Sequence, residues 1–201
     1  MSAIRLGTRA STLATTQSEM VAGLLRSEGL DVNLTTITTH GDTSTASLAA
    51  MGGIGVFASA IRATLLKGEA DIAVHSFKDL PTGRPLGLAI GAVPARADPR
   101  DALVARDGLT LHDLPQEASV GTGSPRRAAQ LLAVRPDLTI VDIRGNVDTR
   151  LGRVKGLGHY AKGGGKEDLD AVVLAASGLA RLGHSGTVTE FLDPSVVLPA
   201  P

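Results

Sequence analysis

The chain has 201 residues, which is enough for one or two domains with a substantial hydrophobic core. Its 20 basic and 20 acidic side chains cancel and only 2% of its residues are aromatic, which argues against a general polyanion binder and against base stacking on nucleic acid. It has no cysteine, its five histidines show no metal-ligand spacing, and neither a signal-like N-terminus nor an apolar run of transmembrane length is present. We therefore expect a monomeric cytoplasmic protein without a metal and without nucleic-acid or membrane partners.

Short apolar runs alternate with helical patterns along the chain. Brief runs bounded by Gly, Pro or Asp predict strands at residues 4–8, 32–39, 72–76, 86–93, 102–105, 119–121, 139–143 and 171–175. Apolar residues at helical spacing predict helices over residues 12–26 and 56–67, with Gly68 as a C-cap. Further helices are expected to start at Ser124, at Asn146 and near Ser177. The alternation indicates an α/β protein with mixed, largely parallel sheets.

Two proline-marked breaks indicate how the chain divides. Residues 93–100 are a polar crossing that contains Pro94 and Pro99, and Asp193-Pro194 marks a second break. We expect two lobes around a central cleft, the first formed by residues 1–94 with 195–201 and the second by residues 95–194. This arrangement is similar to periplasmic-binding-protein-like domains, and clefts between such lobes are common ligand sites. The glycine-rich residues 156–168 are expected to form a surface loop.

Cationic side chains follow the predicted cap Ser124. Pro125 suits the first helical position, and Arg126 and Arg127 then occupy the first turn. A cation at this end of a helix opposes the helix dipole unless an anion compensates it. We favour an anion site here over two unrelated surface arginines.

A second such start follows residue 143. Asn146 can cap the helix, and Arg144 and Arg150 lie near the same end. Asp148 could instead neutralise either arginine as a local ion pair, so both interpretations stay open. Arg9 precedes a third helix start, where Ser11 is the expected cap.

The residues after the predicted strand 72–76 include a Lys–Asp pair. If this segment stays extended, His75, Phe77 and Asp79 face one way, whereas Ser76 and Lys78 face the other. A carboxylate at this place can act as an acid–base group or stabilise a developing cation, and Lys78 can bind an anion or form a Schiff base. The alternative is a solvated Lys–Asp pair at a turn.

Several of these segments together resemble porphobilinogen deaminase, also called hydroxymethylbilane synthase. The motifs are Arg-Leu-Gly-Thr-Arg-Ala-Ser at 5–11, Thr-His-Gly-Asp at 39–42, His-Ser-Phe-Lys-Asp-Leu-Pro at 75–81, Asp-Pro-Arg-Asp-Ala at 98–102, Val-Gly-Thr-Gly-Ser-Pro-Arg-Arg at 120–127 and Ile-Arg-Gly-Asn-Val-Asp-Thr-Arg-Leu at 143–151. The resemblance runs in order from about residue 4 to Pro199, nearly the whole chain.

The resemblance implies a transferase of tetrapyrrole and haem biosynthesis. The family joins four porphobilinogen molecules with release of ammonia, on a covalent dipyrromethane cofactor and without a metal. It implies that Asp79 is the catalytic carboxylate, assisted by Lys78. The positions that match cofactor-binding residues are Ser76, Lys78, Thr122, Ser124, Arg126, Arg127 and Arg150. The positions that match substrate-binding residues are Arg9, Ser11, Arg144, Arg150 and Arg181.

The chain departs from the family pattern in two ways. Ile54 and Ser59 stand where many members have lysines, and the family's third domain, which bears the cysteine that attaches the cofactor, has no counterpart in these residues. We therefore expect this chain to be impaired on its own. The rival hypothesis is a two-lobed solute-binding protein that closes on an anion without catalysis.

Overall fold

The computed structural model describes residues 2–37, 58–83 and 85–200. Contacts divide the chain into a first unit that ends at Ala95 and a second unit, Arg96–Ala200. Some sequence predictions lie outside the described residues: the end of the strand at 38–39, the start of the helix at 56–57, the motif at 39–42, and Ile54. Each unit is an α/β structure with its own sheet.

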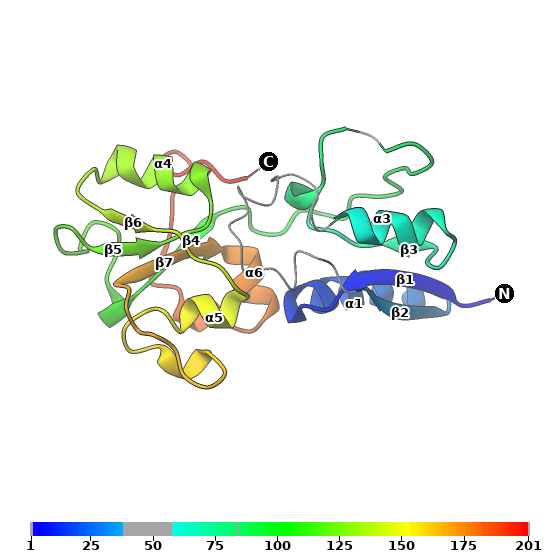
Figure 1. The fold of residues 1–201 in the computed structure, drawn as a ribbon, viewed down its shortest axis with the longest axis horizontal. Coiled ribbons are helices and arrows are strands. Elements are labelled where there is room, and N and C mark those ends of the chain that lie inside the picture. The colour runs from blue at the N-terminus through cyan, green and yellow to red at the C-terminus, as the bar shows by residue number, and fades with distance from the viewer. Residues whose placement is uncertain (1, 38–57, 84, 201) are drawn as a thin grey trace. The chain divides into compact units, whose positions relative to one another are not determined.

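The first unit is built on three parallel strands in the order β2-β1-β3 (Figure 1). They are β1 (Ile4–Arg9), β2 (Val32–Ile37) and β3 (Ile72–Ala73). Helix α1 (Thr12–Ser27) packs on β1 and β2, and α3 (Ala58–Leu66) packs on β1 and β3. The α1 residues Ala22 and Leu25, three apart, meet Leu6 and Val32 in the core because a helix brings such positions to one face. Gly68 follows α3 with a φ of 68°, as a C-terminal glycine should.

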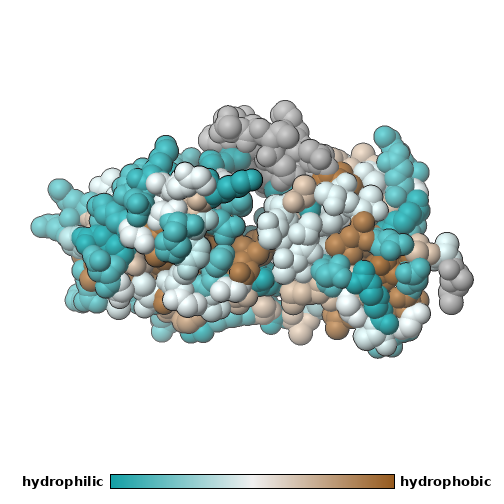
Figure 2. Space-filling view, turned by 90° about the horizontal axis from the view of Figure 1, so that it is seen from below, coloured by the Kyte–Doolittle hydropathy of each residue, from teal (hydrophilic) through white to brown (hydrophobic). Residues whose placement is uncertain are grey.

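The predicted strand over residues 86–93 is wrong. This segment has no strand in the structure, and its side chains are largely exposed: Leu86 is 95% exposed and Val93 66%. No described strand pairs with it, and an apolar pattern cannot form a ladder without a partner for its backbone groups. Figure 2 shows hydrophobic residues at the surface of the first unit among hydrophilic ones.

The second unit has a mixed sheet in the order β6-β5-β7-β4-β8 (Figure 1). Its strands are β4 (Asp101–Ala105), β5 (Ser119–Gly121), β6 (Thr139–Val141), β7 (Ala171–Ala175) and β8 (Glu190–Phe191). Strands β5, β6 and β7 are parallel, whereas β4 runs antiparallel to both β7 and β8. The helices are α4 (Pro125–Val134), α5 (Val147–Leu151) and α6 (Ala176–Arg181). The sequence predicted all of these elements except β8, which has only two residues.

Successive side chains of β4 and β7 pack alternately into two separate hydrophobic cores. Leu103 and Val173 pack with Leu131 of α4, whereas Val104 and Val172 pack with residues of α5 and α6. Helix α4 therefore covers one face of the sheet, and α5 and α6 cover the other (Figure 1). Burial on both faces explains why residues 102–105 of β4 and all of β7 are apolar without interruption.

The last described residues pack with the second unit. The side chain of Val197 is fully buried in the α4 core, and the backbone N–H of Leu198 donates to Gln130 Oε1 on α4 at 2.6 Å. Residues 195–201 were expected to join the first lobe, and the structure places residues up to Ala200 in the second unit because of these contacts.

Short 3₁₀ turns complete the described elements, at Phe77–Asp79, Arg106–Gly108, Gly158–Tyr160 and Ser185–Thr187. Within the described ranges no helix has both the length and the apolar character needed to cross a bilayer. The same residues contain no group of three histidine or carboxylate side chains placed to hold a metal ion.

Candidate functional site

The first unit has a small cavity of about 60 Å³ at the end of β1 and β3. Because parallel strands end at the same edge of a sheet, Arg9 at the end of β1 lies near the residues that follow β3. The cavity is lined by Arg9, Ser11, Leu13, Ala14, Gln17, Val74, His75, Ser76 and Asp79. Four of the residues predicted to form a site, Arg9, Ser11, Ser76 and Asp79, are thus brought together.

Helix α1 is anchored to this edge by polar contacts. Ser11 caps α1, and its Oγ accepts a hydrogen bond from the N–H of Ala14 at 3.4 Å. Ser18 Oγ donates to Thr8 Oγ1 at 2.7 Å, and both residues are fully buried. On the neighbouring residue, Gln17, Oε1 accepts a hydrogen bond from Ser76 Oγ at 2.9 Å. The α1 face with Gln17 therefore holds the segment that leads to Asp79.

Residues 75–79 do not stay extended, so the condition for their side chains to alternate is not met. Strand β3 ends at Ala73, and Phe77–Asp79 form a 3₁₀ turn in which the N–H of Asp79 donates to the carbonyl of Ser76 at 2.9 Å. This turn brings Ser76 into the same cavity as His75 and Asp79, which an extended strand would prevent. Lys78 is exposed and does not line the cavity.

The surroundings of His75 oppose its protonation, chiefly through burial. Burial lowers the pKa of His75; the nearby Asp79 raises it, while the positive charges of Arg62 and Arg9 lower it further. A neutral imidazole, a carboxylate and a guanidinium therefore meet at one cavity. This set can bind an anion and also stabilise a nearby positive charge.

In the second unit, the turn from β5 into α4 packs against the end of β6. A Cβ on Gly123 would lie 2.7 Å from the carbonyl oxygen of Ile143, so only glycine permits this approach. Ser124 caps α4 and accepts from the N–H of Arg127 at 3.4 Å. Thr122 is buried, and its Oγ1 accepts from the N–H of Ser124 at 3.2 Å. The turn is therefore held by its own side chains.

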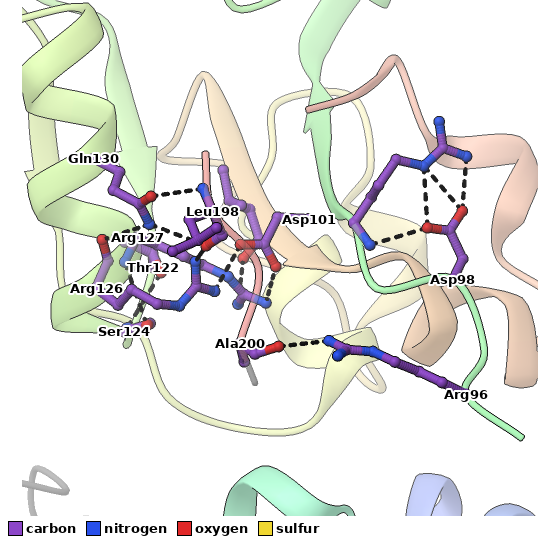
Figure 3. Close-up of polar contacts among 12 residues, drawn as sticks. Arg96, Asp98, Asp101, Thr122, Ser124, Arg126, Arg127, Gln130, Leu198 and Ala200 are labelled. Carbon is purple, nitrogen blue, oxygen red and sulfur yellow. Dashed lines mark hydrogen bonds and ion pairs between the residues drawn. The ribbon is translucent and has the colours of Figure 1, made fainter. Parts of the chain in front are cut away.

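The two arginines of the first turn of α4 share one carboxylate (Figure 3). Asp101 accepts from Nη2 of Arg126 and from Nη2 of Arg127, each at 2.7 Å. Arg126 also donates to the carbonyl of Leu198, and Arg127 donates to the carbonyl of Val173 at 3.2 Å. The Arg127 side chain is only 9% exposed, and its Nε is buried without a hydrogen-bond partner among the described residues.

More positive charge gathers beside α5. Asn146 caps α5, and Arg150 Nε donates to the carbonyl of Gly145 at 2.9 Å. Burial lowers the pKa of Arg150, and the positive charges of Arg127 and Arg144 lower it further, whereas Asp142 acts in the opposite sense. Arg127 and Arg144 therefore lie close enough to Arg150 to repel it, and an anion would relieve this repulsion.

Asp148 bonds to a histidine that sequence spacing did not suggest. His184 Nε2 lies 2.7 Å from Asp148 Oδ1, and Tyr160 packs edge-on against the His184 ring. This contact between residues 36 positions apart ties α5 to the segment after α6.

Arg181 takes part in none of the hydrogen bonds described above. It is the last residue of α6, and its Nε is buried without a hydrogen-bond partner in the part of the chain that the structure describes. Two contacting residues, Asp101 and Gln17, were assigned no role from the sequence. Asp101 could have been suspected from the sequence, because it is a charged residue at the start of the buried strand β4. No sequence feature distinguished Gln17 from the other residues of its helix.

Comparison with known proteins identifies related sequences along the whole chain. The family model for "porphobilinogen deaminase, dipyromethane cofactor binding domain" matches residues 4–201. Porphobilinogen deaminase of Cutibacterium acnes is 98% identical over 100% of this chain and 60% of its own length. The enzymes of that name from Micrococcus luteus and Leifsonia xyli are 59% and 58% identical, over 100% and 99% of this chain and 55% and 58% of their own lengths.

Among solved structures, apo YehZ from Escherichia coli matches 100% of this chain and 78% of its own, with a TM-score of 0.49 and 13% identity.

Proposed function

Because this chain belongs to the porphobilinogen deaminase family, we propose that it is the cofactor-binding part of a hydroxymethylbilane synthase. The chain spans 60% or less of the relatives cited above. The proposed activity is that of a transferase that condenses four porphobilinogen molecules, with loss of ammonia, in haem and other tetrapyrrole biosynthesis.

The observation that carries the proposal is the gathering of cationic groups in the second unit. The positive charges of Arg127 and Arg144 both act on Arg150, and Arg126 shares Asp101 with Arg127. The Nε of Arg127, which is buried and has no hydrogen-bond partner among the described residues, is a further donor. A dipyrromethane that carries acetate and propionate groups fits such donors, because guanidinium groups bind carboxylates in a two-point geometry.

We assign roles to individual residues on this basis. Arg126, Arg127 and Arg150, with Thr122 and Ser124 at the turn, hold cofactor carboxylates, as do Ser76 and Lys78. Arg9, Ser11, Arg144, Arg150 and Arg181 hold carboxylates of substrate. When bound, the dipyrromethane supplies the pyrrole end from which the product chain is extended.

Asp79 is the proposed catalytic residue. Ammonia leaves the aminomethyl group of porphobilinogen, and positive charge then develops on the pyrrole nitrogen. The Asp79 carboxylate, in the cavity with Arg9 and Ser76, stabilises this charge and takes part in the proton movements. A neutral His75 beside it leaves the carboxylate without a competing positive imidazolium.

The proposal also includes a monomeric, cytoplasmic protein whose partners are porphobilinogen and its oligomers. A two-lobed binding protein that closes on an anion without chemistry remains the second hypothesis, since anion binding alone would use the same arginines.

The test compares the Asp79→Asn variant with the unchanged protein. The comparison is made twice, once in this chain and once in the full-length Cutibacterium acnes relative. Porphobilinogen consumption and ammonia release are measured together. We expect the full-length protein to release ammonia and the Asp79→Asn form to lose at least a hundredfold in rate, the order typical for removing an acid–base or electrostatic group.

Asp71→Asn is the matched control, because Asp71 belongs to the same unit but pairs with Arg5 outside the cavity, at 2.7 Å. Its rate should match that of the unchanged protein. Porphobilinogen binding without ammonia release by the full-length protein would instead support the binding-protein hypothesis.

A further inference from the structure

Asp101 is a buried carboxylate that joins the two arginines at the start of α4 (Figure 3). Its side chain is 3% exposed, and each of its oxygens accepts from one guanidinium at 2.7 Å. Neighbouring positions of a helix point about 100° apart, so Arg126 and Arg127 would otherwise diverge. Repulsion between the two positively charged guanidinium groups adds to that tendency. The shared carboxylate is therefore what brings their ends together.

The backbone places Asp101 at the sheet edge from which α4 begins. Asp101 is the first residue of β4 and pairs with Ala175, at the carboxyl end of β7. Strand β7 is parallel to β5, whose carboxyl end leads into α4. Asp101 is thus fixed by a central strand with buried neighbours, and its position does not depend on a loop.

Each guanidinium has a second attachment point besides Asp101. Arg127 donates to the carbonyl of Val173 on β7. Arg126 donates to the carbonyl of Leu198, and Gln130 holds Leu198 through both its side-chain amide atoms. Two attachment points restrict the rotamers of each arginine side chain before a ligand binds. Ligand binding therefore loses less side-chain conformational entropy.

Asp101 has two opposing effects on an anionic ligand. Its negative charge cancels one of the two positive charges, which weakens attraction for any anion. Its two hydrogen bonds fix the directions of the remaining N–H groups, which favours a ligand whose carboxylates match them. The two effects predict changes of opposite sign when the charge is removed.

We propose that Asp101 is a positioning residue for the dipyrromethane carboxylates, and that it acts by holding Arg126 and Arg127 as a fixed pair. This inference rests on the proposed function. It predicts that the site loses selectivity, and not general attraction for anions, when Asp101 is neutralised.

The test is Asp101→Asn in this chain, with two probes titrated by calorimetry. One is a synthetic dipyrromethane with two acetate and two propionate groups, and the other is inorganic phosphate. We expect the dipyrromethane affinity to fall at least tenfold while the phosphate affinity stays equal or rises. A purely structural role would lower stability to urea but leave the folded protein with equal or tighter dipyrromethane binding, and that result would overturn the proposal.

Asp170→Asn is the matched control. Asp170 is also a buried, paired aspartate of the second unit, but it precedes β7 and so lies at the opposite end of that strand. Neither affinity should change in this variant. If the wild-type chain binds no dipyrromethane, the proposed function and this inference both fail; if it does and Asp101→Asn binds equally well, only the inference fails.

If Asp101→Asn does not fold, the proposed fixed pair of arginines can be tested on the wild-type chain. Hydrogen-bonded guanidinium groups rotate slowly, so Arg126 and Arg127 should give separate nitrogen-bound proton signals without ligand in NMR spectra. Signals averaged by free rotation would contradict the fixed pair.

Discussion

Asp170, the residue before β7, is surrounded by donors. Its Oδ1 accepts from Arg106 Nε and Lys155 Nζ at 2.8 Å, and its Oδ2 accepts from the N–H and the Oγ of Ser119 at 2.9 Å. Burial by itself raises the pKa of Asp170, but the bonds from Lys155, Ser119 and Arg106 outweigh it and hold the pKa well below its ordinary value. This carboxylate therefore ties three separate segments together in its ionised form.

We predict that Asp170→Asn lowers the free energy of unfolding by about 2–3 kcal/mol at neutral pH, because it removes one partner of a largely buried ion pair. Since the pKa is lower in the folded state, this contribution is present above the unfolded value near pH 4 and is lost as the pH falls below it. Urea unfolding of both proteins should show their difference shrinking in acid. A constant difference down to the most acidic folded conditions would argue against Asp170 as its source.

At the residue scale, the helix caps could be predicted from the sequence, whereas the ion pairs of Asp101 could not. Ser11, Ser124 and Asn146 were predicted as caps and are confirmed, because a cap bonds to residues two or three positions along the same chain. The pair that Asp101 makes with Arg127 spans 26 positions, and no local rule indicates it.

At the scale of elements, the turns before α4 and α5 are the parts that position the cationic groups. Ser124 and Pro125 start α4, and Gly145, with a φ of 99°, leads to the cap of α5. The short distance that Gly123 allows to Ile143 brings these two turns side by side. The geometry of the cationic cluster thus depends on the glycines Gly123 and Gly145 as well as on the arginines themselves.

We predict that Ser124→Ala lowers the free energy of unfolding by about 1 kcal/mol, since the N–H of Arg127 loses its acceptor at the cap. The same substitution at Ser185, an exposed residue of the same unit, should change it by less than about 0.5 kcal/mol. Chemical denaturation of the three proteins gives both values. Equal effects at the two serines would show that the cap is not what stabilises α4.

At the scale of the whole chain, two units with separate cores are joined through an exposed stretch. Residues 91–99 are exposed without interruption and have no helix or strand. The second unit contains both of its cores between residues 102 and 197. Each unit has the sheet and core that an independently folding domain requires.

We predict that brief trypsin digestion cuts first after Arg96, because its backbone lies in the exposed stretch. The fragment that starts at Ala97 should keep its folded circular-dichroism signal. Arg127, which is 9% exposed and lies within α4, is the internal control and should resist. Mass spectrometry identifies the order of cleavage, and an early cut after Arg127 would contradict a stably folded second unit.

The sequence by itself determined the α/β class, most strands and helices, the caps, and the family. These follow from neighbouring residues: apolar spacing, a serine before a proline, and motifs that are continuous along the chain. The sequence also predicted that the Lys–Asp pair follows a strand. It did not predict the 3₁₀ turn that brings Ser76 and Asp79 into one cavity.

Only the tertiary structure decided how distant segments meet. Residues 86–93 lack a strand although their pattern favours one, since a ladder needs a partner strand. Asp101 faces Arg126 and Arg127, Gln17 accepts from Ser76, and Asp148 meets His184, each across 25 or more positions. Such contacts depend on strand order and helix packing, which are properties of the folded chain and not of any local run of residues.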